Sequence, residues 1–175
     1  GTHAGSQAAP GGLHDVYARV GGPDKDAVQA SSMIQVHSGW VIGDNVWLWR
    51  ADHTAGGQIV KGGANPVETG LEVTGDDVSF IGLAVEHTLG DLVRWSGERG
   101  ATYFYQAELP YDGTNESYAV AGHVGYRVAN AVTEHDAYGV GVYHYFRDHE
   151  VRVPAAIRCP TGLEHRFRSP LTVFL

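Results

Sequence analysis

The sequence predicts an all-β protein, and within that class a right-handed parallel β-helix. Apolar runs of strand length, rich in Val, Ile, Tyr, Phe and Trp, are separated by Gly, Asp, Asn and Pro. Long helical periodicity is absent, and part of the apolar pattern repeats at a spacing typical of solenoids. Each coil is expected to contribute two or three strands, with equivalent positions stacked about 4.8 Å apart along the axis.

The expected elements follow in chain order. Residues 1–12 are small and polar, which predicts a flexible tail or linker, and residues 13–175 are expected to form the coils of an incomplete β-helix domain. Residues 89–99 are expected to be a loop because glycine interrupts the run. The other apolar runs are the expected strands: 14–20, 33–43, 45–51, 70–73, 78–85, 101–109, 125–132, 139–146, 150–154 and 171–175.

An internal repeat supports the solenoid. Most of the repeated positions recur after 37 residues, whereas the dipeptide Asp52-His53 recurs as Glu86-His87 after 34. A difference of three residues is expected if the coils differ in the lengths of their turns. An antiparallel β-sandwich is the alternative, but such folds usually carry tight two-residue hairpin turns, and no Asn-Gly or Asp-Gly pair joins two alternating strands here. The repeat of 37 relates Ile34, Val36 and Val41 to Leu71, Val73 and Val78.

Composition limits the partners. The chain has 175 residues, of which 43% are hydrophobic, so one domain with a real core is expected. A net charge of −8 makes nucleic acid a poor partner, because binding phosphates requires clustered Lys and Arg. No apolar run reaches the roughly 18 residues of a membrane span. The single cysteine, Cys159, excludes an internal disulfide. Both ends look cut, so we expect a piece of a longer protein.

An acid followed by histidine recurs at the ends of apolar runs. If Asp52 and Glu86 close equivalent strands, their carboxylates lie on one face of neighbouring coils, and Glu108 could be the next rung. When two carboxylates lie so close together, their repulsion raises the pKa of one of them, and this carboxyl group can then act as a general acid at neutral pH. The alternative is a structural ladder of polar side chains that satisfy each other. The four dipeptides are Asp52-His53, Glu86-His87, Glu134-His135 and Asp148-His149.

The adjacent acids Asp76 and Asp77 are the second candidate feature. They follow Asp52 by 24 and 25 residues, about one coil of a β-helix, so the three carboxylates are expected to meet across adjacent coils. Three carboxylates in one groove can supply an acid, a base and a supporting charge for glycoside hydrolysis. The alternative is a plain turn, since Asp accepts hydrogen bonds from backbone nearby.

Aromatic and histidine side chains are expected to line the same groove. Trp47 and Trp49 point to the same side of one strand, and exposed aromatic rings beside carboxylates suit a sugar-binding cleft. Core filling is the alternative for any Trp. The residues expected to bind substrate are His53, Glu86, His87 and Trp95.

No cofactor is expected. The chain has neither an HxH nor an HExxH spacing, so a transition-metal site is disfavoured. A calcium ion held by Asp76 and Asp77 is the alternative, because clustered carboxylates are the ligands that calcium prefers.

Several phrases resemble secreted microbial β-helix proteins, including the α-1,3-glucanases and mycodextranases of glycoside hydrolase family 87. These phrases are VWLWRADH, GLEVTGDDVSFIGLAVEHT, TYFYQAELPYD and GYRVANAVTEHDAYGVGVY, and the resemblance covers roughly residues 13–175. It implies an extracellular, right-handed parallel β-helix that hydrolyses a polysaccharide of the α-1,3-glucan type with inversion. It also implies three catalytic aspartates, which match Asp52, Asp76 and Asp77 here.

Two other functions remain open from the residues alone. A polysaccharide lyase would suit the same fold, but it needs a basic residue near a bound cation, and the only lysines are Lys25 and Lys61. A non-catalytic β-helix that binds carbohydrate is the other alternative, and in it the acid–histidine pairs would be structural ladders. The separation of Asp52 from Asp76 and Asp77 discriminates, because the two carboxyls of an inverting site lie about 6.5–9.5 Å apart.

Overall fold

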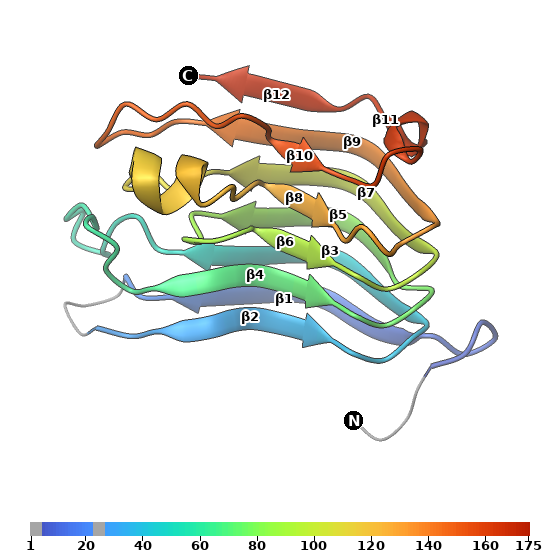
Figure 1. Cartoon of the computed structure of the whole chain (residues 1–175). Helices are drawn as coiled ribbons and strands as arrows, with labels where there is room; N and C mark the ends of the chain where they lie inside the picture. Colours follow the sequence, from blue (N-terminus) through green and yellow to red (C-terminus); the bar gives the residue numbers. More distant parts are fainter. Residues whose placement is uncertain (1–4, 23–26) are drawn as a thin grey trace.

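A computed structural model describes residues 5–22 and 27–175, and in these residues the chain winds as a solenoid of parallel strands (Figure 1). The first four residues of the expected tail lie outside the described residues. The strands are β1 (Gly11–Val20), β2 (Ala30–Val36), β3 (Val41–Arg50), β4 (Val67–Val73), β5 (Ser79–Glu86), β6 (Val93–Trp95), β7 (Gly100–Glu108), β8 (Tyr126–Val128), β9 (His135–His144), β10 (Ile157–Arg158), β11 (Phe167–Arg168) and β12 (Leu171–Phe174).

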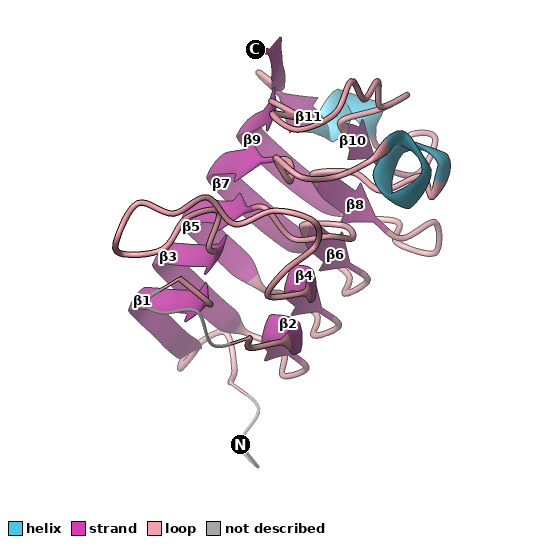
Figure 2. Cartoon of the chain, turned by 90° about the vertical axis from the view of Figure 1, so that its left-hand side faces the viewer, coloured by secondary structure: helices cyan, strands magenta, loops and turns pink. Residues whose placement is uncertain are grey.

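The strands form two sheets, and the chain alternates between them. One sheet has the order β1-β3-β5-β7-β9-β11, with β12 also paired to β9, and the other has the order β10-β8-β6-β4-β2. The pairings between these strands are parallel. The prediction of an all-β parallel β-helix is therefore confirmed, and Figure 2 shows the two sheets as stacked rungs seen from one side.

The strand register tests the internal repeat. Ile34 pairs with Leu71 across β2 and β4, which confirms the repeat of 37 residues. The same spacing continues across β3 and β5, where Trp49 pairs with Glu86. The expectation that Asp52 and Glu86 close equivalent strands was therefore wrong, because Asp52 lies three residues beyond the partner of Glu86. The prediction that Glu108 forms the next rung was correct, since Glu86 pairs with Glu108.

A column of left-handed residues runs through the middle of the long strands. Asn45 of β3 has φ +54°, and its amide donates a hydrogen bond of 2.7 Å to the carboxylate of Asp15, which has φ +52°. The same position is Gly82 in β5 and Gly139 in β9. These residues are skipped in the regular pairing, so each long strand is interrupted there. Asparagine, aspartate and glycine tolerate this backbone region best.

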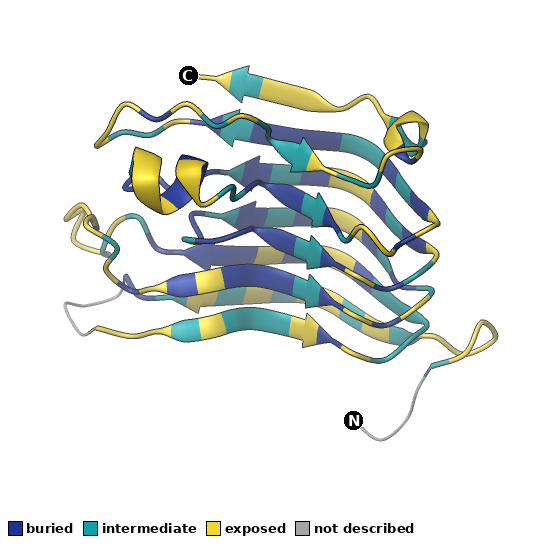
Figure 3. Ribbon diagram, viewed as in Figure 1, coloured by how far each residue is buried: buried dark blue, intermediate teal, exposed yellow. Residues whose placement is uncertain are grey.

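The core lies between the two sheets. Alternation along each strand directs Leu48, Val85 and Ala107 inward, where they are fully buried. Leu71 and Val73 face them from the other sheet as part of the same buried cluster. Figure 3 shows this buried band along the middle strands, with exposed residues at both ends of the solenoid. Burial of each leucine or valine side chain contributes roughly 1.5–3 kcal/mol, which makes this cluster the main source of stability.

Several expected boundaries were wrong. The run expected at 33–43 is divided between β2 and β3 by a turn at Trp40, whose φ is +54°. The expected loop 89–99 contains the short strand β6, and the strand expected at 150–154 is irregular. Strand β1 begins at Gly11, inside the expected tail.

Two short helical segments also form. Asn115–Val120 is a π-helix whose N-cap, Thr114, exchanges hydrogen bonds with Ser117. The second segment is the 3-10 turn Glu164–Arg166. Among the described residues no helix is long and apolar enough to cross a membrane.

The connections at the two edges of the solenoid differ in length. Turns that lead from the even strands into β3, β5, β7 and β9 span four to six residues, at the right of Figure 1. At the opposite edge, where the odd strands end, the chain makes the long connections 51–66, 109–125 and 145–156. This second edge faces the viewer in Figure 2 and holds the site described next.

Candidate carboxylate site

Three acids and a histidine meet where β3, β5 and β7 end. Glu86 and Glu108 are the paired last residues of β5 and β7. Asp52 follows β3, and His87 follows β5. The Nε2 atom of His87 lies 3.8 Å from Oδ1 of Asp52 and 3.9 Å from Oε2 of Glu108. The carboxylates of Asp52, after β3, and Glu108, at the end of β7, thus both lie close to the imidazole of His87, which follows the intervening strand β5.

Strand alternation explains why these side chains face outward together. Leu48, Val85 and Ala107 point into the core, so the following residue of each strand points away from it. Parallel pairing then aligns these following residues in one row across the coils. The row consists of Arg19, Trp49, Glu86, Glu108 and Tyr143.

The carboxyl group of Glu86 has an unusual proton affinity. Partial burial, together with the neighbouring charges of Glu108 and Asp52, raises its pKa to about 7, against the opposing effect of a hydrogen bond from Trp47. Glu86 is therefore divided between its acid and anionic forms near neutral pH. A carboxyl group tuned in this way is suited to general acid catalysis at that pH.

Glu108 is fixed by two polar neighbours. The hydroxyl of Tyr111 donates a hydrogen bond of 2.6 Å to Oε2, and the amide of Gln106 donates one of 3.2 Å to Oε1. Burial, followed by the bond to Glu108, raises the pKa of Tyr111. Sequence reasoning missed Tyr111 and Gln106 as parts of the site, although both lie in the phrase TYFYQAELPYD that it singled out.

Aromatic rings border the carboxylates on the β3 side. Trp47 is 43% exposed and stacks on Trp49 with the ring centroids 5.8 Å apart. Trp49 is covered by the guanidinium of Arg19 at 4.5 Å and by His53 at 5.2 Å. His53 also donates from Nδ1 to Asp52 at 3.0 Å. His53 and His87 lie beside Asp52 as expected, but His87 is 2% exposed, so the prediction that it lines the groove was wrong.

A buried ion pair supports the floor of the site. Arg50 donates two hydrogen bonds of 2.8 Å to the carboxylate of Asp112, and both side chains are almost fully buried. Arg50 also donates to the carbonyls of Ala64 and His87, and Asp112 accepts from the backbone of Gly63. This pair joins the loops that follow β3, β5 and β7, so the positions of the surrounding acids depend on it.

The structure separates Asp76 and Asp77 from Asp52. The two acids lie in the short turn before β5, whereas Asp52 lies beside its far end, and β5 is eight residues or roughly 25 Å of extended chain. Both oxygens of Asp77 bind Arg99, at 2.8 and 2.7 Å. Asp76 accepts a hydrogen bond from the backbone of Glu98. The expected site of three aspartates is therefore not formed. Asp76 and Asp77 instead stabilise the turn through these contacts.

Trp95 was also placed wrongly. Its side chain is 1% exposed and packs in the core against His135, with the ring centroids 4.8 Å apart, so it cannot line a groove. His135 is itself buried at the start of β9, and Asp148 pairs with its neighbour Arg147. In residues 5–22 and 27–175 no group of three His, Cys, Asp or Glu side chains is arranged to hold a metal ion.

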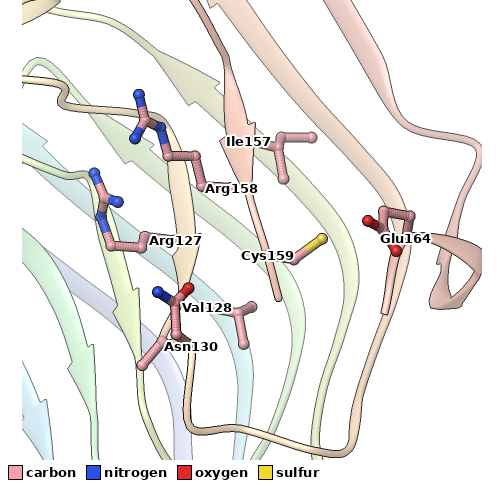
Figure 4. A pocket seen from close by; sticks show the side chains of 8 residues that line it. Arg127, Val128, Asn130, Ile157, Arg158, Cys159 and Glu164 are labelled. Carbon is pink, nitrogen blue, oxygen red and sulfur yellow. The ribbon is translucent and has the colours of Figure 1, made fainter. Parts of the chain in front are cut away.

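A separate pocket opens on the other sheet, beside β8 and β10 (Figure 4). It has a volume of about 560 Å³, and Arg127, Arg158, Cys159 and Glu164 are among its lining residues. Arg127 is already paired with Asp91, at 2.6 Å. Burial raises the pKa of the Cys159 thiol, which disfavours the reactive thiolate. This pocket lacks the paired carboxylates of the first site.

Comparisons with known proteins give a consistent picture. The LAM55 pectate lyase-like domain model matches residues 1–108. An exo-β-1,3-glucanase of Streptomyces sp. (strain SirexAA-E / ActE) is 37% identical over 180 residues, which cover 100% of this chain and 28% of that protein. The family matched is thus not glycoside hydrolase family 87, and the expected α-1,3-glucanase resemblance was wrong at that level, although the β-helix class was right.

Two solved structures of sacteLam55A from Streptomyces sp. SirexAA-E are also similar. A glutamate-to-alanine variant in complex with glucose aligns with a TM-score of 0.79 at 37% identity, over 91% of this chain and 28% of that one. A second structure aligns with a TM-score of 0.72 at 36% identity, over 90% of this chain and 30% of that one. The chain therefore spans less than a third of the length of these relatives.

Proposed function

The chain belongs to the LAM55 pectate lyase-like domain family, and from this premise we propose that it carries the carboxylate site of a β-1,3-glucan hydrolase. The observation that carries the proposal is the pairing of Glu86 with Glu108, in which burial and the neighbouring charges raise the pKa of Glu86 to about 7. The exposed ring of Trp47 borders the pair and supplies a surface on which a pyranose can pack.

In the proposed reaction the Glu86–Glu108 pair donates a proton to the glycosidic oxygen. The two carboxyls interact, so the proton is best assigned to the pair and not to one oxygen. Asp52 accepts a proton from the attacking water. Asp52 and Glu108 each lie within 4 Å of His87 Nε2, so their nearest oxygens are at most about 8 Å apart. This upper bound includes part of the range of about 6.5–9.5 Å for inverting pairs and also the roughly 5 Å of retaining pairs, and we propose inversion. The chemistry requires carboxyl groups and water, and we propose no cofactor.

A β-linked glucan replaces the α-1,3-glucan suggested by the sequence resemblance, because the glucanase relative is named for β-1,3 linkages. A lyase is disfavoured, since it needs a free base near the substrate. Arg50 lies beside the site, but its guanidinium binds Asp112 and backbone carbonyls. We also propose that the protein acts outside the cell, where a polymeric glucan is accessible.

The test is a substrate screen of the intact protein on laminarin, α-1,3-glucan, dextran and pectate. We expect reducing sugar from laminarin and no unsaturated product absorbing at 235 nm. Glu86→Gln and Glu108→Gln should each lower kcat by roughly 100-fold or more. The matched control is Glu72→Gln, on the outer side of the other sheet, where Glu72 accepts a hydrogen bond from Gln35. Intact protein that binds laminarin without releasing sugar would instead identify a carbohydrate-binding scaffold.

A further inference from the structure

His87 is not placed to contact a bound sugar. Its side chain is 2% exposed, so it offers almost no surface to a substrate. Its backbone has φ +65°, a region that residues other than glycine, asparagine and aspartate occupy at a cost of order 1–3 kcal/mol. A strained backbone that persists at a buried histidine requires surroundings that hold it there.

Those surroundings fix His87 from two sides. Its backbone N–H donates to the carbonyl of Glu108 at 2.9 Å, and its carbonyl accepts from Nη1 of Arg50 at 3.1 Å. The imidazole packs against Tyr111 with the ring centroids 4.2 Å apart. The direction of the ring is therefore set by the coils before and after it.

The partners of the ring determine its tautomer. Nδ1 lies 3.3 Å from the carbonyl oxygen of Leu109, and a carbonyl only accepts, so Nδ1 carries a hydrogen. Nε2 then points at Asp52 and Glu108, at 3.8 and 3.9 Å. A bare Nε2 lone pair facing two carboxylate oxygens is repulsive. One further proton shared among Nε2 and these oxygens removes that repulsion.

We propose that His87 is a positioning residue whose Nε2 returns a proton from Asp52 to Glu108 between turnovers. The inference rests on the proposed hydrolysis, after which Asp52 holds the proton taken from water and the Glu86–Glu108 pair has lost one. The proton on Asp52 moves to Nε2, giving an imidazolium with both nitrogens protonated, and Nε2 then passes it to Glu108. No net charge or atom is gained in this return step.

The charged and titratable groups around His87 come from every adjacent coil. Asp52 and Arg50 lie on the β3 side, with Arg50 neutralised by Asp112, and Glu108 and Tyr111 lie on the β7 side. Burial lowers the pKa of His87, while the charges of Asp52 and Glu108 oppose this effect. The resting imidazole is accordingly neutral.

Single-turnover and steady-state rates separate proton return from the chemical step. His87→Asn tolerates a left-handed backbone and keeps an N–H that can reach Leu109, but it lacks Nε2. On laminarin, the intact His87→Asn protein should retain its single-turnover rate within about 3-fold and lose roughly 100-fold in kcat, with KM little changed. His87→Gly should recover kcat as free imidazole is added. The control is His149→Gln, because His149 is exposed on a loop.

Equal losses in the single-turnover and steady-state rates, without rescue by imidazole, would overturn the proposal and leave His87 a purely structural residue. Nitrogen NMR of the labelled histidines tests it without any activity. We expect Nδ1 of His87 to be protonated and the Nε2 resonance to shift in Asp52→Asn and Glu108→Gln proteins. An Nε2-protonated neutral ring would contradict the proposal, whereas laminarin left intact by the wild-type protein would refute only the proposed hydrolysis.

Discussion

Arg50 and Asp112 form a two-pronged ion pair, with both hydrogen bonds at 2.8 Å, although 62 residues of sequence separate them. Asp112→Ala leaves the Arg50 guanidinium buried without its anion, which is expected to lower the free energy of unfolding by about 3–5 kcal/mol. Urea denaturation measures this loss. The exposed pair of Arg152 and Glu150 is the control, and Glu150→Ala should cost less than about 1 kcal/mol. Similar losses in the two variants would contradict the structural role of Arg50.

The pKa of Glu86 predicts a cost of folding at high pH. Because this pKa is about 7 in the folded protein and 4.5 as its ordinary value, the folded state binds more protons between these pH values. Stability therefore falls as pH rises from 4.5 through 7. Glu86→Gln removes the effect, so its free energy of unfolding should exceed that of wild type by about 1–2 kcal/mol at pH 8, after allowance for solvent screening. The difference should vanish near pH 4, as thermal unfolding at several pH values can show.

His135 has the opposite dependence. Burial lowers its pKa from 6.5 to about 4, and Nε2 contacts the hydroxyl of Tyr126 at 2.9 Å. The folded state thus binds fewer protons than the unfolded state, and stability is lost as pH falls from 6.5 through 4. The loss amounts to roughly 3 kcal/mol. His135→Gln, made in the Glu86→Gln background to remove the opposing slope, should flatten the stability curve. An unchanged slope would mean that His135 does not govern acid unfolding.

Trp47 and Trp95 predict contrasting outcomes for the same substitution. Trp47 is 43% exposed, so Trp47→Ala should change the melting temperature little and raise KM for laminarin by about 10-fold, through the lost sugar contact. Trp95 is 1% exposed, so Trp95→Ala should cost about 3–5 kcal/mol of stability. Calorimetry and steady-state kinetics on both variants check the pair. A stability loss in Trp47→Ala without any change in KM would count against the aromatic border.

The fold could be predicted because apolar runs and their repetition survive in the sequence. The repeat of 37 residues is maintained between β2 and β4 and between β3 and β5. The site was harder, because coil length is not constant. Trp49 pairs with Glu86 after 37 residues, but Glu86 pairs with Glu108 after 22. A spacing of 24 or 25 residues therefore does not identify a neighbour in the next coil.

Asp76 and Asp77 show the consequence of that variation. Their spacing from Asp52 suggested one coil, but the long connection 51–66 uses most of those residues before β4 begins. The prediction that Trp95 lines the groove was wrong for another reason. Its strand is three residues long, too short for alternation in the sequence to reveal which side faces the core. Glu108, in contrast, was predictable as the next rung, because residues 101–108 of β7 align without insertion against residues 79–86 of β5.

The two edges of the solenoid differ in how freely their connections can change in length. Short turns on one side keep the rungs in register, and the long connections 51–66, 109–125 and 145–156 all leave from the side that carries the acids. Loop-closure entropy rises only slowly with length, so insertions there cost the scaffold little. If the chain acts as proposed, its substrate choice can change by loop replacement while the stacked interior stays constant, and loop exchange between homologues tests this.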